Sequence, residues 1–217
     1  NLALTIKANK LYPYLKDKST ESLDKETLQG IVKNTKAMIL HKIGTVVVSG
    51  TDNLLLTYFF GVVAVGLYSN YYLIINSLNI VYTLIFSSTV ASIGNLGAEK
   101  GGQNSIESYN RINFFGNWLY GFSSICLFVL LNPFIGEVWL NKEYLFDTFI
   151  VFILSANFYV MGMRKATLSF REAFGLYYYD RYKPVFESLI NLIASIILAK
   201  YFGVAGVFIG TMLSMLT

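Results

Sequence analysis

The stretch "SGTDNLLLTYFF", residues 49–60, places one carboxylate inside an apolar run, and this combination decides how the rest of the chain is interpreted. Asp52 is the single charged residue among the 21 residues of Ile43–Val63, and no charged residue occurs from Asn53 to Ala98. A soluble protein distributes Lys and Glu over its exposed faces, whereas a bilayer core about 30 Å thick requires about 20 apolar residues per helix. The sequence therefore predicts an integral membrane protein.

The overall composition points the same way and excludes several chemistries. Hydrophobic residues make up 54% of the chain and charged residues 14%, where a soluble domain has about 25% charged residues. The single cysteine, Cys126, lies in an apolar segment and cannot form a disulfide framework within the chain. The sequence contains no phosphate-binding loop, no HExxH motif and no Cys/His cluster. We therefore expect neither an enzyme nor a protein that carries an organic cofactor.

Apolar segments separated by polar connections predict an all-α, polytopic bundle of transmembrane helices. The expected spans are about 37–60, 67–94, 112–132, 144–163, 185–202 and 204–217, and the last of them is truncated. Residues 1–36 are expected to hold the end of a preceding helix and a basic cytoplasmic linker. In this linker Leu28, Ile31, Thr35 and Met38 recur at helical spacing. That pattern fits either an amphipathic helix on the inner leaflet or a lead-in continuous with the first span.

The distribution of basic residues predicts the orientation. With the linker in the cytoplasm, the three inner segments hold 15 of the 17 Lys and Arg residues, and the outer segments hold only Lys142 and Lys200. Cytoplasmic loops carry an excess of basic residues in this way. The similar stretches "FGVVAV" (60–65) and "FGVAGV" (202–207) both fall on the outer side, where we expect each to form a tight glycine-containing connection between two spans.

Polar side chains recur on one face of several predicted spans. One such stripe is common packing between helices, but stripes on four helices favour a shared polar interior, because lipid would leave these groups without partners. The residues expected to line this interior are His41, Ser49, Asn76, Asn79, Asn113 and Asn117.

Several motifs resemble bacterial polysaccharide flippases. The stretch "VVVSGTDNLLLTYFFGVVAVGLYSNYYLIINSLN" is similar to the hairpin of helices 7 and 8 in that family. Residues 170–211, with "DRYKP" and "GVAGVFIGT", resemble its helix 10–11 loop, helix 11 and the start of helix 12. The same superfamily includes the multidrug and toxin extrusion (MATE) exporters and the lipid II flippase. The resemblance implies that the chain is the second six-helix lobe of a MATE-like flippase, and that a first lobe of the same chain is missing here.

The resemblance implies a multi-pass protein of the cell membrane that moves undecaprenyl-pyrophosphate-linked oligosaccharide from the inner to the outer leaflet. Its partners would be this lipid-linked oligosaccharide, membrane lipids and the missing first lobe, with no nucleic acid. A cation-coupled exporter of small molecules remains an alternative within the superfamily. A membrane-embedded polysaccharide polymerase is a third possibility, although the short external segments argue against it.

Asp52 requires its own explanation, because a charge at the centre of the bilayer costs about 2.5–3.5 kcal/mol on insertion scales. Hard cations such as Na⁺ take carboxylate, amide and hydroxyl oxygens. A related lipid II flippase has a sodium site among helices 7, 11 and 12. By that resemblance Asp52, Glu187, Asn191 and Thr211 are candidates for ion coupling by Na⁺ or H⁺, with Asp52 as the candidate Na⁺ ligand. Asp52 could instead line the passage or serve as a structural hydrogen-bond acceptor.

Overall fold

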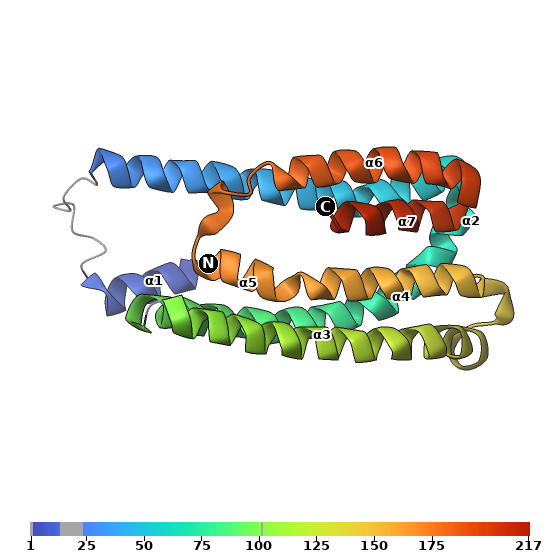
Figure 1. The fold of residues 1–217 in the computed structure, drawn as a ribbon, viewed down its shortest axis with the longest axis horizontal. Helices are drawn as coiled ribbons and strands as arrows, with labels where there is room; N and C mark the ends of the chain where they lie inside the picture. The colour runs from blue at the N-terminus through green and yellow to red at the C-terminus, as the bar shows by residue number, and fades with distance from the viewer. Residues whose placement is uncertain (1, 14–23, 101) are drawn as a thin grey trace.

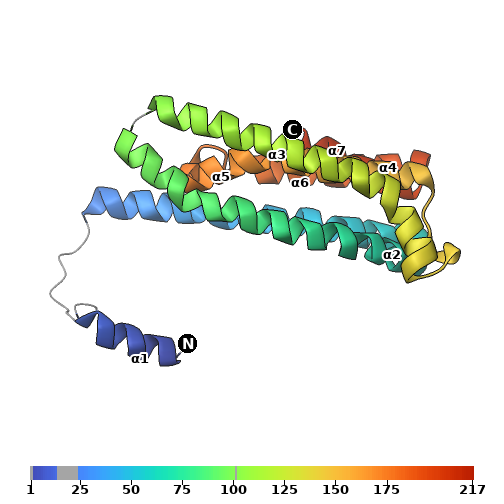
Figure 2. The same ribbon diagram turned by 90° about the horizontal axis from the view of Figure 1, so that it is seen from below.

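The computed structural model describes residues 2–13, 24–100 and 102–217, and the part of the chain that it describes is helical without β-strands. The first helix, α1 (Leu2–Leu11), lies apart from the others in Figure 2. The section of the predicted linker at 14–23 lies outside the described residues. From Lys25 onward the linker is helical and continuous with the next element, as the lead-in interpretation predicted.

The long element α2 (Lys25–Lys100) is a pair of helices joined at Gly61. Gly61 has φ 80° and ψ 175°, which is far from helical geometry. Figures 1 and 2 both show the chain reversing direction at this point, so that the two halves of α2 run antiparallel. Residues 25–60 and 62–100 therefore form a helical hairpin, and the glycine of "FGVVAV" makes its turn, as expected.

The next helices complete one side of the bundle. α3 (Gly102–Pro133) is followed by the π-helical turn η2 (Phe134–Trp139), the 3₁₀ turn η3 (Lys142–Tyr144) and α4 (Thr148–Met163). Asp147 caps α4, because its side chain accepts a hydrogen bond from the backbone N–H of Phe149 at 3.0 Å. Asp147 thus has a structural role at the start of this helix.

The remaining elements lead back across the bundle. α5 (Lys165–Ala173) follows α4 after a single turn residue, and η4 (Leu176–Tyr178) connects it to α6 (Lys183–Phe202). The last helix is α7 (Val204–Met215). Gly203 separates α6 from α7 with φ 60° and ψ −141°, so the glycine of "FGVAGV" also makes a reversal. Sequence analysis treated 164–183 as a loop and did not identify α5.

Figure 1 shows two groups of helices. The first half of α2 lies with α6 and α7, and the second half of α2 lies with α3, α4 and α5. Contacts between α4 and α7 join the groups. α6 and α7 pack so closely that a Cβ atom on Gly206 would lie 2.0 Å from the carbonyl oxygen of Leu198.

Four helical segments within the described residues are long and apolar enough to cross a membrane, and α7 is a shorter apolar helix. They are Lys25–Asn95, which includes both arms of the α2 hairpin, Asn104–Trp139, Thr148–Ala173 and Lys183–Phe202. Their outer faces carry large apolar side chains, such as Tyr58, Val63 and Phe114, which are 82%, 78% and 75% exposed. Water-soluble proteins rarely expose contiguous apolar surface of this kind, so these faces are suited to lipid.

Aromatic residues form much of the interior. Tyr71, Tyr120, Phe158 and Phe208 are fully buried, and Tyr82 packs edge-on against Tyr120. Tyr71 also links the end of α3 to the segment before α4. Its hydroxyl donates a hydrogen bond to Asn132 at 2.6 Å and accepts one from the backbone N–H of Phe146 at 2.8 Å. Such hydrogen bonds provide partners for polar atoms, which lipid chains cannot do.

Candidate functional site

A cavity of about 340 Å³ lies between the two groups of helices. Both halves of α2 line it, together with α4, α5, α6 and α7, whereas α3 does not. Ligand sites typically have volumes of about 300–1,000 Å³ and apolar walls with a few polar groups. This cavity has that character, with Tyr68, Phe158 and Phe208 among its walls and charged side chains between them.

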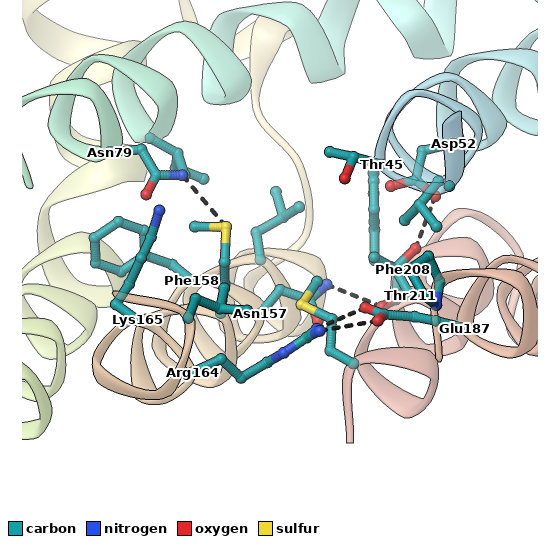
Figure 3. Close-up of a pocket in the computed structure, with 18 of the residues that line it drawn as sticks. Thr45, Asp52, Asn79, Asn157, Phe158, Arg164, Lys165, Glu187, Phe208 and Thr211 are labelled. Carbon is teal, nitrogen blue, oxygen red and sulfur yellow. Dashed lines mark hydrogen bonds and ion pairs between the residues drawn. The ribbon is translucent and has the colours of Figure 1, made fainter. Parts of the chain in front are cut away.

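Asp52 lies at one end of a buried chain of hydrogen bonds (Figure 3). The Thr211 hydroxyl donates to Asp52 Oδ1 at 2.7 Å, and the Asn191 amide donates to Thr211 Oγ1 at 2.9 Å. Helix α7 holds Thr211 in place because Gly210 allows α6 to approach closely: a Cβ atom there would lie 2.2 Å from Ser195 Oγ. Three of the four ion-coupling candidates therefore share one network.

The fourth candidate, Glu187, belongs to a different pair. Its carboxylate accepts two hydrogen bonds from the Arg164 guanidinium, at 2.6 and 2.8 Å. The two side chains are 13% and 24% exposed, so the pair is largely desolvated. A bidentate pair of this kind neutralises both charges. Glu187 lines the same cavity as Asp52, but its charge is already matched by Arg164.

Cationic groups line the cavity in excess. Arg164, Lys165, Arg171 and Lys183 face two carboxylates, Asp52 and Glu187. Two of these cations, Lys165 and Lys183, lie outside any ion pair among the described residues, and Lys165 donates instead to Thr83 Oγ1 at 3.1 Å. The cavity is therefore better suited to an anionic ligand than to a cationic one.

His41 lies at the end of the cavity near the α5–α6 connection. Its Nε2 is 3.0 Å from Asp180 Oδ1, and Arg171 donates to Asp180 Oδ2 at 2.8 Å. The Tyr177 ring meets His41 edge-on. Burial, reinforced by the Glu172 carboxylate, raises the pKa of the Tyr177 phenol, so the ring stays neutral beside these charges. This cluster holds the α5–α6 connection against the first half of α2.

The predicted asparagines have different positions. Asn79 lines the cavity, and its amide donates to Met161 Sδ at 3.4 Å. Asn76, Asn113 and Asn117 are half-buried and lie outside the lining. α3 packs against α4 instead of reaching the cavity, which accounts for the last two. The side chain of Ser49 is not among those the structure describes.

Sequence reasoning did not identify the cationic lining. It counted Arg164, Lys165 and Lys183 only as topological charges in a cytoplasmic loop. The available signal was the continuation of the apolar pattern of α4 beyond Met163, with Leu168 and Phe170 on the far side of the basic pair. Asn157, whose amide donates to the Phe208 carbonyl at 2.9 Å, was also missed, because it is an isolated polar residue in an apolar helix.

The described side chains contain no group of three His, Cys, Asp or Glu residues suited to a transition metal. Carboxylate, amide and hydroxyl oxygens of this network are the kinds of ligand that hard cations take. The Oδ1 atom of fully buried Asn191 has no hydrogen-bond partner in the described part of the chain.

Comparisons with known proteins gave no match to a family model, to a curated protein or to a solved structure.

Proposed function

We propose that this chain is the second six-helix lobe, about residues 37–217, of a transporter that flips undecaprenyl-pyrophosphate-linked oligosaccharide across the cell membrane. The observation that carries the proposal is the cavity whose lining combines four cationic side chains with two carboxylates. In this proposal the basic linker and the α5–α6 connection face the cytoplasm, where most of the Lys and Arg residues fall.

The chemistry of the substrate accounts for the mixture of groups. A pyrophosphate must leave water to cross the bilayer, and cations in a region of low dielectric compensate for its lost hydration. Lys165 and Lys183 are available for this task because neither is in an ion pair in the described structure. Amide groups such as that of Asn79 can hydrogen-bond the sugar, and the polyprenyl tail can remain in the bilayer.

The buried network around Asp52 supports coupling to a cation. A carboxylate that alternates between binding and releasing Na⁺ or H⁺ can bias a protein between two conformations. Asp52 joins the first half of α2 to α7 through Thr211, so a change in its charge acts on the contact between these helices. Coupling of this kind is compatible with both transporter classes and does not by itself identify the substrate.

A cation-coupled exporter of small molecules is the second candidate, favoured by the aromatic walls of the cavity, including Tyr68 and Phe208. The two candidates differ in the charge of the ligand. The test is binding by the full-length protein in nanodiscs of a fluorescent polyprenyl-pyrophosphate oligosaccharide, compared with an organic cation such as ethidium.

The flippase proposal predicts binding of the pyrophosphate ligand, and a loss of about tenfold or more in affinity on replacing both Lys165 and Lys183 with Gln. The matched control replaces Lys142 and Lys200, which lie away from the cavity lining. Preferential binding of ethidium, unaffected by Lys165→Gln and Lys183→Gln, would instead support the exporter.

A further inference from the structure

Two cationic side chains from distant parts of the sequence converge on one aromatic ring outside the cavity. The Lys33 ammonium lies 3.5 Å from the centroid of the Tyr178 ring, and the Arg181 guanidinium lies 3.9 Å from the same centroid. Arg181 also lies 4.6 Å from the centroid of Tyr182. We refer to Lys33, Tyr178, Arg181 and Tyr182 as the basic–aromatic patch.

The charges of this patch are not compensated within the described part of the chain. Neither Lys33 nor Arg181 takes part in an ion pair there. The neighbouring Asp180 is already bound to Arg171 and His41. Attraction to a ring face is worth about 0.5–2 kcal/mol per cation and neutralises neither charge. The patch therefore has an unmet requirement for an anion.

The position of the patch in the fold indicates which anion. Arg181 and Tyr182 immediately precede α6, which begins at Lys183. Lys33 lies in residues 25–36 of α2, which precede the first expected span and are called the α2 extension here. Tyr179, between Tyr178 and Arg181 in the sequence, is 83% exposed, and Phe186, in the first turn of α6, is 63% exposed. Tyrosines beside basic residues at the end of a span lie typically at the level of lipid headgroups.

We infer that the basic–aromatic patch binds the phosphate of an anionic phospholipid headgroup at the cytoplasmic surface. The phosphate would be held by Lys33 and Arg181, with the Tyr178 ring keeping both cations in position. A bound headgroup would connect the α2 extension to the α5–α6 connection. This site is separate from the cavity, because none of the four patch residues lines it.

The test uses the full-length protein in nanodiscs of phosphatidylcholine containing 30% phosphatidylglycerol, with the retained lipids counted by native mass spectrometry. The wild type is expected to retain phosphatidylglycerol preferentially. Lys33→Gln together with Arg181→Gln should reduce that preference by about fivefold per cation removed. Lys142→Gln together with Lys200→Gln, which removes the same charge elsewhere, should leave the preference unchanged.

Three results would overturn the inference. An equal loss in the two double variants would mean that only net charge matters. A fall in thermal stability that is as large in pure phosphatidylcholine as with phosphatidylglycerol would mean that the patch is a structural clamp between helices. The single Lys33→Gln variant, altered at an exposed position, provides the same comparison should the double variant fold poorly. Inorganic phosphate must also fail to displace the lipid, since displacement would assign the site to a soluble anion.

Discussion

The hydrogen bonds of Asp52 run in one direction, from Asn191 to Thr211 and from Thr211 to the carboxylate. An ionised carboxylate only accepts, and the hydroxyl of Thr211 both accepts and donates, so the chain is satisfied with Asp52 charged. Its burial nevertheless leaves the charge without a basic partner, since none of the described ion pairs includes Asp52. A bound cation or proton would supply the missing compensation.

Asp52→Asn should therefore retain the fold and abolish ion-dependent transport by the full-length protein. The amide keeps an acceptor for Thr211 at a cost of about 1 kcal/mol in the free energy of unfolding, but it cannot titrate or match a cation. The measurement is transport under imposed Na⁺ and pH gradients. Asp147→Asn is the control, because Asn also caps helices. Normal transport by Asp52→Asn across both gradients would leave Asp52 with a structural role alone.

Glu187→Gln should destabilise the protein by about 3 kcal/mol, because it leaves the Arg164 guanidinium unpaired in a largely buried position. Changing Arg164 to Gln as well should restore part of this loss, since no buried charge then lacks a partner. Equilibrium unfolding of the two single variants and the double variant measures the coupling. Additive effects would show that the ion pair contributes nothing specific.

At the residue scale, sequence reasoning placed Asp52, Asn191 and Thr211 together by resemblance and by helix. The structure brings these side chains within hydrogen-bonding distance. The same resemblance made Glu187 a candidate for ion coupling, but it did not identify the pairing with Arg164. Arg164 lies 23 positions earlier, at the turn between α4 and α5, and no sequence pattern links the two residues.

At the scale of elements, two glycines determine where the chain reverses. Gly61 and Gly203 combine positive φ with extended ψ, a region that is accessible essentially only to glycine. The sequence therefore predicts these turns from chemistry alone. Helix α5 was not predicted, because charged residues in a hydropathy pattern normally indicate a loop. In the structure α5 is a helix, and its Lys165 and Arg171 line the cavity.

Gly61→Ala and Gly203→Ala should each destabilise the protein by about 1–3 kcal/mol, through backbone strain and without any clash, since nothing lies within 4 Å of either added Cβ atom. Gly66→Ala is the control. An added Cβ atom at Gly66 also has nothing within 4 Å, but Gly66 has helical geometry, so this substitution should stabilise the protein by up to about 1 kcal/mol. Thermal unfolding in detergent distinguishes the two classes. Equal behaviour of all three variants would contradict the assigned turns.

At the scale of the whole molecule, the predicted orientation places both ends of each helical hairpin on the cytoplasmic side. Single cysteines at positions 100 and 171, introduced into a Cys126→Ala background, should react with an impermeant maleimide only in opened cells. A cysteine at position 142 should react in intact cells. Labelling of position 100 from outside intact cells would reverse the orientation and with it the assignment of the basic–aromatic patch to the inner leaflet.

The whole arrangement explains why the cavity could not be derived from hydropathy. Apolar periodicity identifies helices, but the cavity depends on which faces of α2, α4, α5, α6 and α7 meet, and α3 is excluded only by packing. The polar stripe of α3, with Asn113 and Asn117, resembles the other stripes in sequence and is directed elsewhere in the fold.

The most direct test of the proposed function is translocation of a fluorescent polyprenyl-pyrophosphate oligosaccharide by the full-length protein in proteoliposomes, followed by quenching of the outer leaflet. The account predicts rapid exposure of the inner pool with the wild type, and a loss of about tenfold or more in rate with Lys165→Gln and Lys183→Gln. The Lys142→Gln and Lys200→Gln control should retain the wild-type rate. Exposure no faster than in protein-free liposomes would contradict the proposed flippase function.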